Sequence, residues 1–180
     1  MFANQWKNED WRLVRDWLAE GGCKQQKLKA ILTVTTALTN FLDRQFGMPL
    51  SVQLHDQFMD KISADEAKLL HCQAGNYALR RQVSLCYQGV VMFDAESVLP
   101  LHDLPQSLVE ALEAGIKPLA SLLAERGLSL ARSDLSIIQL DDGRWGRRSV
   151  LRSSVGTQAL VVEIFKPEFW QEIQRLEGQR

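Results

Sequence analysis

The sequence predicts an α+β domain in which helices flank an antiparallel sheet of about six strands. Three observations favour this fold class. Segments with the period of a strand follow one another across short turn signals, as they do in hairpins. Other segments have the period of an amphipathic helix. The two kinds do not alternate regularly along the chain, which disfavours a parallel doubly wound sheet.

Five segments have helical spacing, and glycine or proline residues bound most of them. Gly21-Gly22 ends the first segment and Gly47 closes the second. Gly115 and Pro118 divide the fourth into halves, and Pro167 opens the last. The predicted helical segments are residues 8–20, 27–46, 64–70, 106–127 and 167–176.

Six segments have the character of strands, and three dipeptides supply tight turns between them. The turns are Gln88-Gly89, Asp142-Gly143 and Val155-Gly156. Both faces of the last strand are apolar, so we expect it to be buried on both sides. The predicted strands are residues 50–60, 77–86, 90–100, 133–140, 145–154 and 158–166.

The length of 180 residues suits one domain spanning residues 1–180, in which residues 1–26 form an N-terminal helical appendage. The formal net charge of −1 gives no reason to expect a nucleic-acid partner. No signal peptide and no apolar run of ~18 residues is seen, so we expect a cytoplasmic protein without a membrane span. The three cysteines form no disulfide framework, and the scattered histidines predict no metal site.

Two charged residues lie on faces that are otherwise apolar. In the strand 77–86, Arg81 shares a face with leucine and valine, while Arg80 lies on the polar face. In the strand 158–166, Glu163 lies in line with alanine, valine and phenylalanine. A buried arginine that loses its partner costs about 3–5 kcal/mol, so both groups need an explanation.

Two explanations fit the spacing equally well. Arg81 and Glu163 could form a buried ion pair with each other. Alternatively they line a pocket, because a guanidinium binds a planar carboxylate through two parallel hydrogen bonds and a nearby carboxylate can bind a hydroxyl or move a proton. The second explanation predicts a small ring that carries a carboxylate and a hydroxyl.

The densest basic stretch is residues 143–152, GRWGRRSVLR. Arginines interleaved with an aromatic residue can stack on nucleic-acid bases, but the acidic residues next to this stretch and the neutral total charge weaken that interpretation. We interpret Arg148 and Arg152 as solvated strand residues that pair with local carboxylates. Arg147 is less settled, because it lies beside Trp145 and Leu151.

The block Trp145-Gly146-Arg147-Arg148-Ser149, followed by ALVVEIFKP, resembles the C-terminal signature of the chorismate pyruvate-lyase family. LRRQVSLCYQGVVMFDAESVLP is similar to the central hairpin of that family, and TALTNFLDRQFGMPLSVQLHDQF to its N-terminal helix and first strand. The resemblance covers about residues 30–167, which it implies are the core. One departure is Glu96, which stands where the family commonly has an arginine.

The resemblance implies a lyase that converts chorismate to 4-hydroxybenzoate and pyruvate, the family's usual role being to supply the ubiquinone ring precursor. It implies no cofactor or metal, because aromatisation of the ring drives the reaction. Arg81 and Glu163 would be catalytic residues that also bind substrate. Leu119 and Ala120 would contact the ring carboxylate through the backbone, and Leu38 would form a pocket wall.

A non-catalytic binding module or effector sensor of the same fold, binding chorismate or a hydroxybenzoate, is the alternative function. Some transcription regulators carry such a domain after a DNA-binding winged helix. The roughly 30 residues that precede the resemblance are too few for such a helix unit. The expected partners are therefore the small-molecule substrate and its aromatic product, and the oligomeric state that we favour is a monomer.

Overall fold

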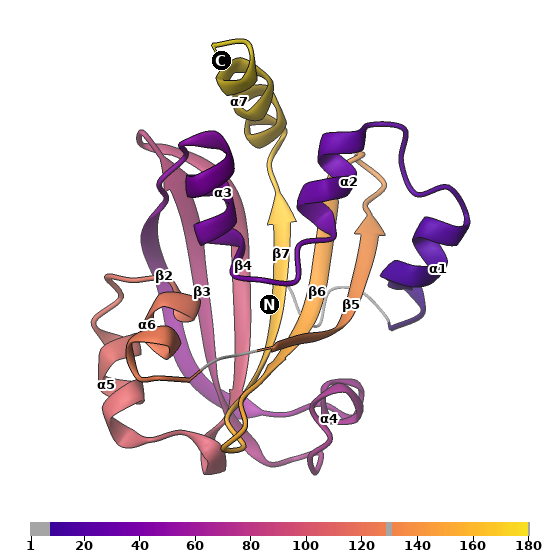
Figure 1. Cartoon of the computed structure of the whole chain (residues 1–180). Coiled ribbons are helices and arrows are strands. Elements are labelled where there is room, and N and C mark those ends of the chain that lie inside the picture. Colours follow the sequence, from indigo (N-terminus) through magenta and orange to yellow (C-terminus); the bar gives the residue numbers. More distant parts are fainter. Residues whose placement is uncertain (1–7, 129–130, 180) are drawn as a thin grey trace.

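The computed structural model describes residues 8–128 and 131–179. These residues form one sheet with the strand order β1-β5-β6-β7-β4-β3-β2, in which every pairing is antiparallel (Figure 1). The predicted α+β fold on an antiparallel sheet is therefore confirmed. The strands are β1 (Arg12–Leu13), β2 (Ser51–Lys61), β3 (Tyr77–Tyr87), β4 (Val90–Pro100), β5 (Ala131–Gln139), β6 (Trp145–Arg152) and β7 (Gln158–Phe165).

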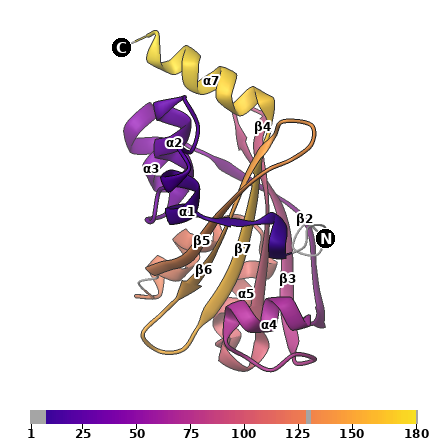
Figure 2. The same cartoon turned by 90° about the vertical axis from the view of Figure 1, so that its right-hand side faces the viewer.

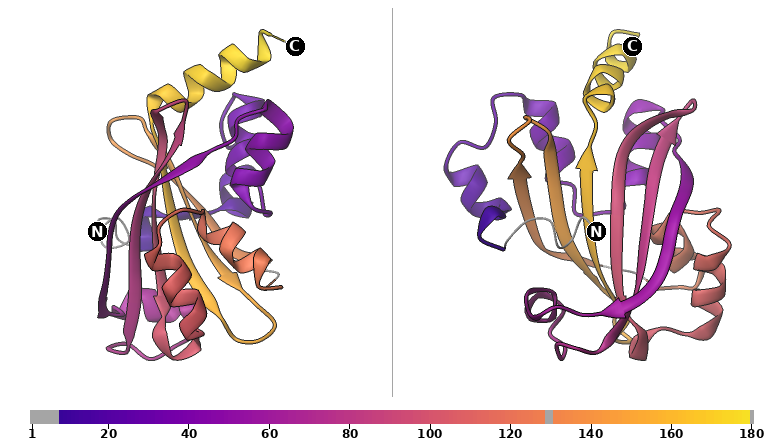
Figure 3. Two further views of the ribbon diagram at one scale, coloured as in Figure 1. Left: turned by 90° about the vertical axis from the view of Figure 1, so that its left-hand side faces the viewer. Right: turned by 180° about the vertical axis from the view of Figure 1, so that it is seen from behind.

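Helices cover the two faces of the sheet unequally. We call the face toward the viewer in Figure 1 the front face; α2, α3, α5 and α6 lie over it, whereas α4 lies behind the sheet (Figures 2 and 3). The helical elements are η2 (Asn8–Asp10), α1 (Val14–Ala19), α2 (Gln26–Leu32), α3 (Leu38–Phe46), α4 (Ala64–Leu70), η3 (Leu101–Asp103), α5 (Gln106–Glu113), α6 (Leu119–Glu125) and α7 (Pro167–Glu177). None of the described helices has the length and apolar character needed to cross a membrane.

The β3–β4 hairpin is the longest predicted feature that the structure reproduces. Its two strands have eleven residues each, and Gln88 and Gly89 join them with φ angles of 49° and 80°. Two positive φ angles in a two-residue turn match the right-handed twist of the flanking strands. The hairpin puts Arg81 opposite Ser97 in the middle of the sheet.

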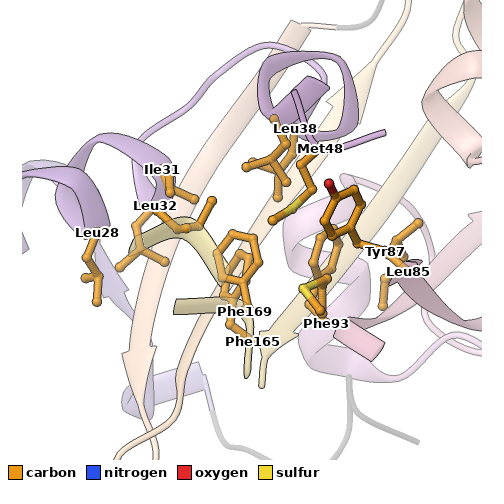
Figure 4. Close-up of a cluster of buried hydrophobic side chains, with 14 of the residues drawn as sticks. Leu28, Ile31, Leu32, Leu38, Met48, Leu85, Tyr87, Phe93, Phe165 and Phe169 are labelled. Atoms are coloured by element: carbon orange, nitrogen blue, oxygen red, sulfur yellow. The ribbon is translucent and has the colours of Figure 1, made fainter. Parts of the chain in front are cut away.

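An aromatic cluster fills the upper part of the front face (Figure 4). The ring centroids of Phe165 and Phe169 are 4.9 Å apart, and those of Phe93 and Phe165 are 5.2 Å apart. Pro167 starts α7 two residues after β7 ends, which brings Phe169 back over Phe165. Leucine and isoleucine side chains of α2 belong to the same cluster and hold that helix against the sheet.

The back face of the sheet has its own apolar clusters. Ile62, Ala67 and Leu70 pack with residues of β3, β4, β6 and β7, while Trp11 packs with Val162 and others. Seven of the eight residues of β7 are buried, so the prediction that this strand is covered on both sides is confirmed.

The N-terminal part of the chain differs from the prediction in two places. The single helical region 27–46 is two helices, because residues 33–37 leave the helical path between α2 and α3. Carbonyl groups of this connection accept hydrogen bonds from arginine side chains of the sheet, where in a continuous helix they would accept them from backbone amides. Within residues 8–20 only Val14–Ala19 is α-helical, and the preceding Arg12–Leu13 pair with β5. Residues 1–7 of the predicted appendage lie outside the described residues.

Gly146 is required by the packing on the back face of β6. A Cβ atom at this position would lie 2.6 Å from Cδ1 of Ile164 and 2.9 Å from Cγ2 of Ile138. Both isoleucines are buried, so we expect Gly146→Ala to lower the free energy of unfolding by about 1–3 kcal/mol. Urea unfolding checks this, with Gly178→Ala as the control, since its Cβ would meet no atom closer than 3.7 Å. Equal stability of the two variants would contradict the packing argument.

Candidate functional site

A cavity lies on the front face of the sheet, between β3, β4 and β7 on one side and α3 and α6 on the other. Its walls are mostly apolar, and its volume of about 50 Å³ is enough for a few water molecules. A ring-sized ligand would therefore require α3 or α6 to move outward. The residues around it are Leu38, Thr39, Arg81, Val83, Leu85, Phe93, Ala95, Ser97, Pro118, Leu119, Ala120, Arg132, Leu151, Val161 and Glu163.

The structure brings all five residues that the sequence singled out to this one cavity. Leu38 begins α3, and Leu119 and Ala120 begin α6, so the two helices present their first turns to the sheet. Arg81 comes from β3 and Glu163 from β7. Strand alternation places both side chains on the front face, because β4 lies between β3 and β7 and pairs Ser97 with Arg81 and Ala95 with Glu163.

Arg81 is buried and is only weakly satisfied by the rest of the protein. Its side chain is 1% exposed, and its Nη2 donates a hydrogen bond of 3.1 Å to the carbonyl of Lys117. Its Nε has no hydrogen-bond partner, and no described carboxylate forms an ion pair with it. Burial lowers the pKa of Arg81 to about 10, so the guanidinium still carries its charge at neutral pH.

Glu163 has two arginine partners, and neither of them is Arg81. One carboxylate oxygen accepts a close hydrogen bond from Nε of Arg147, and the other lies 3.5 Å from Nη2 of Arg132. Burial alone would raise the pKa of Glu163, but the charges and hydrogen bonds of Arg147 and Arg132 lower it below its ordinary value. The ion pair between Arg81 and Glu163 that the sequence allowed is thus replaced by a cluster of Glu163, Arg147 and Arg132.

The sequence missed Arg132 as a site residue, and it left Arg147 undecided. Arg132 lies one residue before the predicted start of its strand, so alternation never assigned it to a face. In the structure it belongs to β5, and it donates to Oγ of Ser149 at 2.7 Å and to the carbonyl of Thr36 at 3.2 Å. Arg147, which the sequence left undecided, is fully buried.

Arg148 is not the solvated residue that the sequence predicted. Only 7% of it is exposed, and its guanidinium lies 4.9 Å from the ring centroid of Trp11 on the back face. The prediction failed because the N-terminal segment, through Trp11, covers the side of β6 on which Arg148 lies. Arg152, by contrast, pairs with Asp134 at 3.1 Å, as expected of a local carboxylate.

Arg80 belongs to a separate network on the back face. It is 2% exposed, and its two terminal nitrogens donate to the two carboxylate oxygens of Glu66 at 2.9 and 2.8 Å. Glu66 belongs to α4, where it also completes a capping box with Ser63. Arg80 is therefore buried under α4, and Arg80 and Arg81 form a matched pair of adjacent buried arginines, one bound by a carboxylate and one not.

No protein-family model and no curated protein matches this sequence. Solved structures do match. PhnF from Mycobacterium smegmatis aligns with a TM-score of 0.60 at 14% identity, over 76% of this chain and 66% of PhnF. The separate effector domain of that protein gives 0.59 at 14% identity, over 74% and 90%. The ligand-binding domain of a putative GntR-family transcriptional regulator from Bordetella bronchiseptica gives 0.55 at 15% identity, over 66% and 86%.

These comparisons correct the expected activity. The solved structures named above are a transcriptional regulator, its effector domain and the ligand-binding domain of another regulator, so the prediction of a chorismate pyruvate-lyase is wrong. What stands is the α+β fold that the resemblance implied, since identities of 15% or less establish a shared fold and no shared chemistry. This chain spans about two thirds of PhnF and most of its separate effector domain.

The arginine cluster predicts a strong dependence of stability on Glu163. Glu163→Gln removes the charge that neutralises Arg147 and Arg132, so we expect the free energy of unfolding to fall by about 3–5 kcal/mol. The control is Glu172→Gln, which breaks an ion pair with Arg175 on the surface of α7 and should cost less than about 1 kcal/mol. Urea unfolding of the two variants at neutral pH measures the difference.

The same cluster predicts how stability changes with pH. Because the pKa of Glu163 is lowered in the folded protein, its contribution is complete above the ordinary value of 4.5 and is lost as the pH falls through the folded pKa. Between neutral pH and about pH 3, Glu163→Gln should therefore lose less of its remaining stability than the wild type does. Parallel stability curves for the two proteins would show that the pKa of Glu163 does not differ between the folded and the unfolded state.

Proposed function

We propose that this chain is a non-catalytic sensing module that binds a small organic anion, with a carboxylate of the ligand on Arg81. The observation that carries the proposal is the guanidinium of Arg81, which is buried and charged and has a carbonyl as its only described hydrogen-bond partner. Leaving such a group without a counter-ion costs stability, so its presence at the floor of a cavity indicates that a ligand supplies the missing charge.

The cavity walls favour a ligand with an apolar body. Leu38, Leu119, Val83, Phe93 and Val161 line the space around Arg81 with apolar surface. A flat ring or short hydrocarbon body fills such walls, and a carboxylate then meets Arg81 through two parallel hydrogen bonds. Because the volume is small, we expect the ligand to displace the first turn of α3 or α6 as it enters.

Glu163 is better suited to recognition than to proton transfer. Its two arginine partners lower its pKa and keep it ionised, so it can accept a hydrogen bond, has no proton to give and is a weak base. A ligand hydroxyl that reaches Glu163 would donate to one of its free lone pairs. In this proposal Arg81, Leu38, Leu119, Ala120 and Glu163 bind a ligand and carry out no reaction on it.

The shared fold adds support from a second direction. The separate effector domain of PhnF and the ligand-binding domain from Bordetella bronchiseptica both align with this chain over most of their own length. The chemical class of the ligand follows in this proposal from Arg81 and the cavity walls.

The test is calorimetric titration with 4-hydroxybenzoate, a small aromatic carboxylate, and with its neutral amide 4-hydroxybenzamide. The wild type should bind the carboxylate and discriminate against the amide. Arg81→Met keeps an unbranched apolar stem but removes the charged guanidinium, and should weaken carboxylate binding by about 2–4 kcal/mol. Arg44→Met, at an exposed position on α3, is the binding control.

Stability distinguishes a ligand-binding arginine from a structural one. Arg81→Met removes an uncompensated buried charge, so its free energy of unfolding without ligand should equal or exceed that of the wild type. Arg80→Met, at the neighbouring position, leaves Glu66 unpaired and should lose about 3–5 kcal/mol. If Arg81→Met is less stable than the wild type without ligand, or if it binds 4-hydroxybenzoate as tightly as the wild type does, Arg81 does not bind the ligand.

A further inference from the structure

A surface groove lies between α2, α7 and the turn that joins β5 to β6, at the upper end of the sheet in Figures 1 and 2. It consists of two adjoining hollows of about 350 Å³ each, which share Gln25, Leu28, Trp170 and Gln174. One hollow continues between the two helices, and the other continues to the turn, where Trp145 lies. We call this surface the α2–α7 groove; none of its residues lines the cavity described above.

Two tryptophan side chains bring unpaired hydrogen-bond donors to the α2–α7 groove. The indole N–H groups of Trp145 and Trp170 have no hydrogen-bond partner among the described residues, and neither nitrogen is fully buried. An indole N–H can only donate. The side-chain amides of Gln25 and Gln174 are at exposed positions and are also without a partner in the described part of the chain. The groove therefore offers several donors to an occupant that has acceptors.

Aromatic neighbours hold both indole rings in place. The ring of Trp170 lies 5.3 Å from that of Phe165 and 4.6 Å from that of Phe169, measured between centroids. The ring of Trp145 lies 5.8 Å from that of Trp17. Both groove tryptophans remain half-buried, so each keeps some apolar surface for an occupant. Because packing already restricts these rings, they lose little conformational freedom when something binds.

The charged residues of the α2–α7 groove are paired with one another. Lys27 forms a close ion pair with Glu177 in one hollow, and Arg144 pairs with Asp142 at 2.8 Å in the other. The four groups sum to zero charge. An uncharged occupant therefore matches the groove, whereas a charged one would have to compete with one of these pairs.

The backbone of the occupant decides its conformation. An added strand needs a free sheet edge, but the two edges of this sheet are β1 and β2, and neither lines the groove. The carbonyls of a bound α-helix are occupied within the helix and would leave the indole donors unpaired. A polyproline II helix has no internal hydrogen bonds, and proline has no N–H, so its carbonyls are free acceptors.

We propose that the α2–α7 groove binds a proline-rich segment of a partner protein in the polyproline II conformation. The proline rings pack on Trp145 and Trp170, and carbonyls of the segment accept hydrogen bonds from the two indole N–H groups. Aromatic-lined grooves suit such segments because the ligand is already extended and loses little entropy on binding. This site is separate from the Arg81 cavity and does not depend on the function proposed for it.

The first experiment uses the wild-type protein and two uncharged peptides of equal length, acetyl-octaproline-amide and the flexible acetyl-(Gly-Ser)4-amide. Calorimetric titration should show that octaproline binds at least about tenfold more tightly, because only this peptide is preorganised. The chain has five tryptophans, and octaproline should shift the indole N–H resonances of Trp145 and Trp170 while that of Trp11, on the back face, stays in place.

Conservative variants then test the two donors. Trp145→Phe and Trp170→Phe keep an aromatic ring but remove the N–H, so each should weaken octaproline binding about three- to tenfold. Trp11→Phe is the matched control and should bind octaproline as the wild type does. The same variants assign the indole resonances.

Three results would overturn the proposal. Octaproline could fail to bind or bind no better than the glycine–serine peptide. It could bind without shifting the resonances of Trp145 and Trp170, which would place it elsewhere on the protein. Finally, cellohexaose, an uncharged oligosaccharide, could shift those resonances where octaproline does not, which would make the groove a carbohydrate site.

Discussion

The buried contact between Glu163 and Arg147 is the constraint on which the arrangement of the front face depends. With its Nε on Glu163, Arg147 turns Nη1 toward the chain above it and donates to the carbonyls of Val34 at 2.9 Å and Ile31 at 3.5 Å. Arg132 reaches the carbonyl of Thr36 in the same way. Residues 33–37 are thereby attached to the sheet, and since α3 follows directly, the position of Leu38 at the cavity depends on a carboxylate in β7.

The sheet thus separates two uses of buried charge. On the back face, Arg80 binds Glu66 of α4 through two hydrogen bonds. Its charge is therefore neutralised within the chain, and the pair attaches α4 to the sheet. On the front face, Arg81 lies at equal depth and has only a carbonyl partner. Under the proposed function, the stability lost at that position is recovered when an anion binds. Adjacent residues of one strand would then serve folding and binding separately.

Strand alternation was sufficient to predict much of this arrangement. It defined the β3–β4 hairpin, the buried β7, and the unusual positions of Arg81 and Glu163, because a side-chain period of two depends only on local geometry. It was insufficient wherever a distant segment decides the outcome: α4 covers Arg80, Trp11 covers Arg148, and the partners of Glu163 come from β5 and β6. The lyase activity was inferred from motifs, but the fold also serves regulators, so a shared fold does not establish a reaction.

The arginine cluster also limits how this sequence can change over generations. Arg132, Arg147 and Glu163 neutralise one another in part, so a substitution at any one of them leaves a buried charge unbalanced in its neighbours. Single steps away from the trio pass through an unstable protein, whereas simultaneous change of several positions is rare. Descendants of this chain should therefore keep the three residues as a set or lose them as a set, while Arg81, whose one described hydrogen bond goes to the carbonyl of Lys117, is freer to vary.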